Sequence, residues 1–183
     1  MVTSGSLVNP ALFFLSKVTT HQDYGQGSKH NNDIAIMETE PFQFNEYVQP
    51  ACLPELKTTI AQGDLLRVSG FGLTHKINTP NKIYHLKLLD VPYHEDQVCA
   101  KLFSKLPSWW NRLWVSETMF CAGPLKGGED ACKGDSGGPI VKIENSVATL
   151  VGVVSWGKGC ALPNLPGVYA DARYFIDWIK ANM

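Results

Sequence analysis

Residues 127–139, GGEDACKGDSGGP, place Ser136 in a glycine-rich turn. A serine hydroxyl is a weak nucleophile until a neighbouring base takes its proton, and that base itself needs an orienting group. Glycines at 134, 137 and 138 allow the positive φ that directs successive N–H groups into one concavity, where a developing oxyanion could bind. The stretch therefore predicts a nucleophile loop whose base lies elsewhere in the fold.

The elements that position this loop are predicted to be short strands. Apolar runs at 65–71, 83–91, 136–143 and 148–156 alternate with Gly, Pro and Asn, which is typical of a β-barrel or sandwich. Residues 141–143 and 147–154 indicate a hairpin, and residues 11–15 (ALFFL) indicate a strand. The spacing of Phe175, Ile176 and Ile179 predicts a helix over 172–183, capped by Asp171.

The segment 103–114 holds three of the five tryptophans. It is interpreted as a loop with a short helical turn packed on the barrel, in preference to an exposed aromatic surface for a partner.

The charge balance, 16 Lys+Arg against 17 Asp+Glu without a basic run, argues against nucleic acid as a partner. No stretch approaches the roughly 20 apolar residues of a membrane span. The run at 11–15 lacks the cationic flank of a signal peptide, so no export signal is visible in the sequence.

Five cysteines are present, and none has the spacing of a zinc site, so neither a metal nor a cofactor is expected. Disulfides formed in an oxidising compartment are favoured over reduced thiols. Two bridges would leave one thiol over, and spacing alone does not choose the pairing. The five are Cys52, Cys99, Cys121, Cys132 and Cys160.

Residues 127–139 resemble the nucleophile loop of the trypsin-like serine proteases, which have the chymotrypsin fold. The resemblance extends in order along nearly the whole chain, through residues 32–36 (NDIAI), 49–54 (QPACLP), 69–72 (SGFG, with Phe71 for the usual Trp), 119–123 (MFCAG), 155–157 (SWG), 166–169 (PGVY) and 176–179 (IDWI). It implies an all-β, chymotrypsin-like double antiparallel β-barrel with a C-terminal α-helix. The implied parts are an incomplete first barrel (1–49), a connection (50–56), a second barrel (57–170) and the helix (171–183).

The resemblance implies a role for each matching site residue. Ser136 would be the nucleophile, Asp33 would orient the base, and the N–H groups of Gly134 and Ser136 would form the oxyanion hole. Asp130 would form the floor of the specificity pocket and favour Arg or Lys, because a neutral side chain would leave its buried charge unpaired. The implied pocket walls are Ser155, Trp156, Gly157 and Gly167, with Ser155 to Gly157 pairing with the substrate backbone. Taken alone, Asp33 could be a turn residue and Asp130 a solvated acid.

The resemblance also pairs the cysteines. It implies the disulfides Cys99–Cys121 and Cys132–Cys160, and it makes Cys52 the position that tethers an upstream propeptide or light chain. Leu66 and Lys142 occupy the positions of a further bridge found in many members.

The family's histidine base, in a Thr-Ala-Ala-His-Cys segment, has no counterpart in this sequence, and residues 1–8 resemble the strand that follows it. His30 is a poor substitute because it lies on a connecting loop. His21, His75, His85 and His94 are expected in packed or solvated roles. The activating N-terminus that would pair with Asp135 is also missing, so Asp135 is expected to turn outward in a zymogen-like loop.

Three functions remain open. The favoured one is an extracellular serine endopeptidase that cleaves after Arg or Lys, with the present chain inactive by itself. It would meet protein substrates and protease inhibitors. The alternatives are a non-catalytic secreted homologue that binds partners through the cleft or the tryptophan segment, and a short isoform with a dominant-negative role or no stable role. An upstream Ala-Ala-His-Cys segment and reaction of Ser136 with a fluorophosphonate would distinguish the first from the second.

Overall fold

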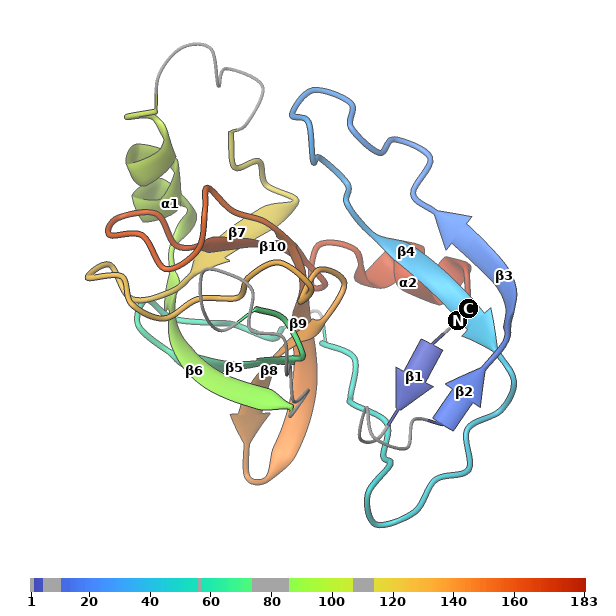
Figure 1. Ribbon diagram of the computed structural model, residues 1–183. Helices are drawn as coiled ribbons and strands as arrows, with labels where there is room; N and C mark the ends of the chain where they lie inside the picture. The colour runs from blue at the N-terminus through green and yellow to red at the C-terminus, as the bar shows by residue number, and fades with distance from the viewer. Residues whose placement is uncertain (1, 5–10, 56, 74–85, 107–113) are drawn as a thin grey trace.

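The computed structural model describes residues 2–4, 11–55, 57–73, 86–106 and 114–183. Its centre is a closed barrel of six strands in the order β10-β7-β6-β5-β8-β9, with every neighbouring pair antiparallel (Figure 1). This barrel confirms the all-β class. Its strands are β5 (Leu65–Gly70), β6 (Lys87–His94), β7 (Met119–Ala122), β8 (Pro139–Glu144), β9 (Val147–Trp156) and β10 (Gly167–Asp171).

The barrel closes around side chains that alternate along its strands. In β5, Leu66 and Val68 are buried while Leu65 faces solvent, as the two-residue period of a strand requires. The inner residues form one core with Val91, Ile140, Val151, Phe120 and Tyr169. The rings of Phe120 and Tyr169 stack with centroids 5.4 Å apart.

The hairpin predicted for residues 141–154 is present as β8 and β9. Its turn residues Asn145 and Ser146 have φ of 49° and 65°, the pair of positive values that a two-residue hairpin turn of type I′ needs. The strand predicted at 83–91 is β6, whose described part runs further, to His94; residues 83–85 lie outside the described residues. The run at 11–15 contributes to two strands, β2 (Ala11–Phe13) and β3 (Leu15–Thr20).

The strands before residue 50 form two separate ribbons beside the barrel (Figure 1). One pairs β1 (Val2–Ser4) with β2, and the other pairs β3 with β4 (Ala35–Thr39). Val18 of β3 and Met37 of β4 are 53% and 54% exposed, so this ribbon leaves apolar side chains uncovered among the described residues. Ile34 and Ile36 nevertheless pack against Phe175 and Ile179, which joins the ribbon to the C-terminal segment.

The described residues include two helices, which flank the barrel. Helix α1 (Asp96–Phe103) had not been predicted, although Cys99 and Phe103 stand four residues apart and are both buried on one face. Helix α2 (Ile176–Ala181) is shorter than the predicted span of 172–183, which was wrong at both ends. Asp171 does not cap α2: its carboxylate accepts the N–H of Arg173, and its carbonyl the N–H of Phe175, which forms a separate turn before the helix.

Leu66 and Lys142 show how the barrel holds together without the additional bridge. The register of β5 and β8 pairs Arg67 with Val141, so the next positions in that register are Leu66 and Lys142. Leu66 is fully buried in the core. The Lys142 ammonium donates to the carbonyl of Thr59 at 3.0 Å and pairs with Asp64 and Glu144. These two positions therefore contribute a packing contact and a polar anchor to the barrel.

The tryptophan segment lies mostly outside the described residues, at 107–113, so both interpretations of it stay predictions. Trp114 at its end is 47% exposed. No helix among the described residues is long and apolar enough to cross a membrane.

Candidate active site

The loop around Ser136 is braced against strand β9 by its own backbone. Gly137 donates to the carbonyl of Val154, and Val154 donates back to the carbonyl of Gly138, each at 2.9 Å. Gly134 and Gly137 have φ of 98° and 79°, so glycine is required for both bends. Gly138 has no room for a side chain, because an added Cβ would lie 2.7 Å from the carbonyl of Asp135. Ser136 is exposed at the apex of this turn.

Asp33 reaches the second barrel through Ser155. The Ser155 hydroxyl donates to Oδ2 of Asp33 at 2.6 Å. Ser155 follows Val154, the residue that braces the nucleophile loop, so Asp33 and Ser136 converge on the same end of β9. This second role of Ser155 was missed from the sequence, because nothing in the spacing of residues 33 and 155 relates them.

Asp130, six residues before Ser136, has one paired and one unpaired carboxylate oxygen within the described ranges. Oδ2 accepts the N–H of Ala161 at 3.0 Å, whereas Oδ1 is buried and has no hydrogen-bond partner in the described part of the chain. Burial, with a smaller contribution from the charge of Asp135, raises the pKa of Asp130 to about 6 against the opposing pull of two backbone N–H groups. Asp130 is therefore a partly desolvated acid with one carboxylate oxygen that has no partner among the described residues.

Tyr169 and Gly167 lie beside the carboxylate of Asp130. The Tyr169 hydroxyl is the other buried polar atom without a partner among the described residues, and burial raises its pKa. A Cβ added to Gly167 would lie 2.8 Å from Oδ1 of Asp130 and 3.2 Å from the Tyr169 hydroxyl oxygen. Gly167 thus leaves open the space beside both atoms, and Tyr169 is a site residue that sequence reasoning had not singled out.

Asp135 corrects one expectation. Its carboxylate does not turn outward: it accepts the N–H of Gly72 at 2.7 Å and the N–H of Cys132 at 2.9 Å. Two backbone donors compensate the charge that had been expected to need an ammonium. The carboxylate lines a cavity of about 750 Å³ that also includes Gly70, Asp130 and Leu89.

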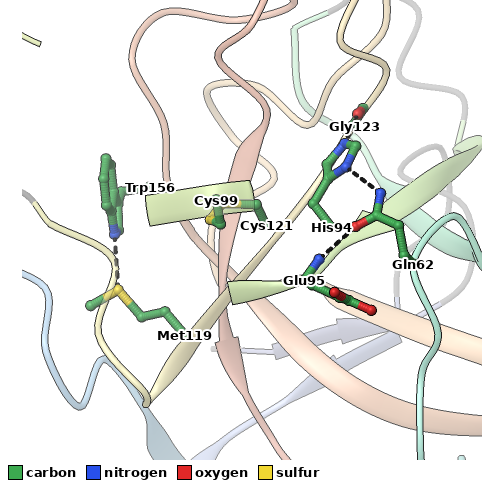
Figure 2. The surroundings of a disulfide bond; sticks show 8 residues. All are labelled: Gln62, His94, Glu95, Cys99, Met119, Cys121, Gly123 and Trp156. Atoms are coloured by element: carbon green, nitrogen blue, oxygen red, sulfur yellow. Dashed lines mark hydrogen bonds between the residues drawn. A yellow bond between two sulfur atoms is a disulfide. The ribbon is translucent and has the colours of Figure 1, made fainter. Parts of the chain in front are cut away.

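The indole of Trp156 is held by contacts with helix α1, strand β7 and the loop of His30. Its Nε1–H points at the sulfur of Met119, 3.4 Å away (Figure 2). The ring packs edge-on against Phe103, with centroids 5.2 Å apart, and stacks with His30 at 5.9 Å. Gly157 follows it and is exposed. Helix α1 and strand β7 therefore position the side chain that the sequence placed on the pocket wall.

The three described histidines are all engaged. His21 packs between the rings of Phe175 and Trp178. His94 is buried, with Nδ1 facing the Gln62 amide and Nε2 donating to the carbonyl of Gly123 (Figure 2). His30 lies on Trp156; burial lowers its pKa, and the charge of Asp33 only partly offsets this. His75 and His85 lie outside the described residues.

Two disulfides join elements near these residues. Cys99–Cys121 ties α1 to β7, as Figure 2 shows, and Cys132–Cys160 ties the nucleophile loop to the segment beyond β9. Cys52 is free and exposed. Among the described residues, no group of three or more His, Cys, Asp or Glu side chains is placed to hold a metal ion.

The closed six-stranded antiparallel barrel is typical of the chymotrypsin-like class of proteins. An exposed serine in a glycine-rich turn and a buried acid near it fit the same class. Comparison with known families agrees: the Trypsin family model matches residues 6–179, and the chain belongs to that family of serine proteases. It is 39% identical to the curated mouse (Mus musculus) protein "Tryptase" over 172 residues, which is 92% of this chain. The chain spans 61% of the length of that relative.

Proposed function

We propose that the protein to which this chain belongs is a secreted serine endopeptidase that cleaves after Arg or Lys through an acyl-enzyme. The supporting observation is the convergence of Asp33 and the Ser136 loop on one end of β9, through the Ser155 hydroxyl and the Val154 backbone. Membership of the trypsin family and the likeness to a protein named tryptase support the same function.

In the proposed reaction, Ser136 Oγ attacks the scissile carbonyl carbon while a base removes its proton. The N–H groups of Gly134 and Ser136 would stabilise the oxyanion. Collapse of the tetrahedral intermediate breaks the C–N bond, the protonated base returns its proton to the leaving amine, and an ester to Ser136 remains. Water then attacks the ester carbonyl while the base removes its proton. The base returns that proton to Ser136 Oγ as the ester C–O bond breaks, which releases the acid product and the free serine.

The preference for Arg or Lys rests on Asp130. Its buried Oδ1 has no partner among the residues that the structure describes, so a cationic side chain reaching the pocket floor would gain a charge-assisted hydrogen bond, whereas a neutral side chain would not. The Tyr169 hydroxyl and the open face of Gly167 lie beside the same oxygen. A substrate chain would enter as an added strand along residues 155–157.

The base is proposed to be an imidazole from sequence beyond these 183 residues, and the 183-residue chain alone is proposed to be inactive. His21 and His94 are engaged in aromatic or hydrogen-bonded contacts with residues outside the loop, and His30 stacks on Trp156. Without a base, turnover in a related triad falls on the order of a millionfold.

The test compares the protein isolated from its source with the 183-residue chain, using a fluorophosphonate probe and peptide substrates carrying Arg, Lys or Leu before the cut. We expect labelling and cleavage after Arg and Lys only in a form that contains the additional histidine, and loss of both in Ser136→Ala. A histidine-containing, proteolytically activated form that neither labels nor cleaves would refute the proposal and favour a non-catalytic homologue.

A further inference from the structure

The loop that carries Asp33 is fastened to the second barrel by the side chain of Asn31. Oδ1 of Asn31 accepts hydrogen bonds from Ser116 Oγ at 2.7 Å and from Thr118 Oγ1 at 2.8 Å. These hydroxyls lie 85 and 87 positions further along the chain, in the segment that leads into β7. We call Asn31, Ser116 and Thr118 the polar clasp.

Both sides of the polar clasp are held by further hydrogen bonds. On the loop side, the Asn31 amide donates to the carbonyl of Gln26, and the Asn31 carbonyl accepts the N–H of Gly25, each at 2.8 Å. On the barrel side, Thr118 is 3% exposed, and its carbonyl accepts the N–H of Asp171. The clasp therefore joins a closed loop to a buried part of the barrel.

A second contact runs parallel to the clasp. The hydroxyl of Ser28, a residue only 1% exposed, donates to the carbonyl of Trp114 at 2.9 Å. The loop is thus attached at two points to the segment before β7, and neither attachment involves a residue with a role in the proposed chemistry.

Between the clasp and Asp33 there is only Asn32, and it is fixed. Asn32 is 8% exposed, has a φ of 54°, and donates from its side chain to the carbonyl of Asp23. A shift of Asn31 therefore has no flexible linker to absorb it before Asp33. Directly beyond, the Asp33 carboxylate meets the Ser155 hydroxyl at 2.6 Å.

We propose that Asn31 is a positioning residue: by accepting the hydroxyls of Ser116 and Thr118, it holds Asp33 against Ser155 and so sets the orientation of the base that serves Ser136. This inference rests on the proposed endopeptidase function. Small displacements of such a group are costly, because a misplacement of about 1 Å can lower a rate on the order of a hundredfold.

The test uses the full-length activated protein and a peptide substrate with Arg before the cut. Asn31→Ala should lower kcat about ten- to a hundredfold with KM within about twofold, because the Asp130 pocket is untouched. The matched control is Asn45→Ala, which also removes an amide oxygen with two donors, the N–H groups of Tyr47 and Val48, but in a loop without site residues. This control should retain the kcat of the parent.

The pair Ser116→Ala and Thr118→Val, combined, removes the clasp from the barrel side. It should give the same loss of kcat as Asn31→Ala, and the triple variant should be no slower than either, because the groups act as one unit. If Asn31→Ala fails to fold, this double variant carries the test. A kcat equal to that of Asn45→Ala, or losses that simply add in the triple variant, would overturn the proposal.

A structural readout separates this inference from the function on which it rests. Hydrogen exchange at the Ile34 amide, which donates to the Asn32 carbonyl at 2.9 Å, should accelerate at least tenfold in Asn31→Ala and not in Asn45→Ala. If the parent protein has no turnover, the endopeptidase proposal fails, and unchanged exchange at Ile34 would then also reject the clasp. Accelerated exchange in the same inactive protein would support the clasp as the element that fixes Asp33.

Discussion

The hydroxyl of Ser155 donates a 2.6 Å hydrogen bond to Oδ2 of Asp33, across 122 positions of sequence. This bond joins the segment just before strand β4 to the end of strand β9 in the closed barrel. The same end of β9 is hydrogen-bonded to the loop of Ser136. The carboxylate therefore has a fixed partner on the barrel before any base is bound. This relationship leads to the first prediction.

Ser155→Ala should lower kcat of the full-length protein about tenfold, because Asp33 loses the donor that holds its carboxylate. The free energy of unfolding should fall by about 1 kcal/mol, the net value of one such hydrogen bond. Steady-state kinetics and urea unfolding measure the two effects. Ser104→Ala, which removes an exposed hydroxyl bonded to the Lys101 carbonyl, should change neither.

Asp130 should give the free protein a pH-dependent stability. Its folded pKa of about 6 is raised above the ordinary value of 3.8, so between these values the folded state binds more protons than the unfolded state. Stability should therefore fall as pH rises from about 4 to about 6. Asp130→Asn should abolish this slope and be more stable above pH 6 by up to about 3 kcal/mol. Urea unfolding at pH 4 to 8 measures the slope, and Asp177→Asn, at an exposed helical site, should keep it.

Gly167→Ala should close the pocket floor to cations. An added Cβ would lie 2.8 Å from Asp130 Oδ1, in the space that a substrate ammonium or guanidinium would need. We expect the affinity for an aromatic amidine, measured by calorimetry at pH 7.5, to fall at least a hundredfold. An amidine that still bound Gly167→Ala with unchanged affinity would place its site away from Asp130. Circular dichroism would establish that the variant retains the fold.

Leu66→Ala should destabilise the second barrel by about 2–5 kcal/mol, because it leaves a cavity at a position with no exposed surface. The neighbouring Leu65→Ala removes the same atoms from a side chain that is 65% exposed and should cost well under 1 kcal/mol. Urea unfolding of the pair measures the contrast. Equal effects would mean that the core of this barrel is not where the alternation of β5 places it.

Much of the architecture was predictable because local patterns carry it. The alternation in β5, the hairpin of β8 and β9, and the glycine bends around Ser136 follow from side-chain period and backbone freedom, which are properties of a few adjacent residues. Helix α1 was not predicted, although its buried residues Cys99 and Phe103 have the four-residue spacing of one helix face. The start of α2 was placed too early because Asp171 uses its carboxylate on Arg173 instead.

The sequence by itself determined the family, four of the six barrel strands (β5, β6, β8 and β9) and the residue types that could act as nucleophile, orienting acid and pocket acid, because short motifs and local alternation carry them. Only the tertiary structure decided how these groups meet. Ser155 donates to Asp33, and Tyr169 lies beside Asp130. His30 stacks on Trp156, and Asn31 accepts two hydroxyls that lie 85 and 87 positions away in the sequence. It also decided that Asp135 turns inward, because the N–H groups of Gly72 and Cys132 compensate its charge. Such contacts depend on how strands and loops close in space, and no local pattern encodes the partner of a single side chain.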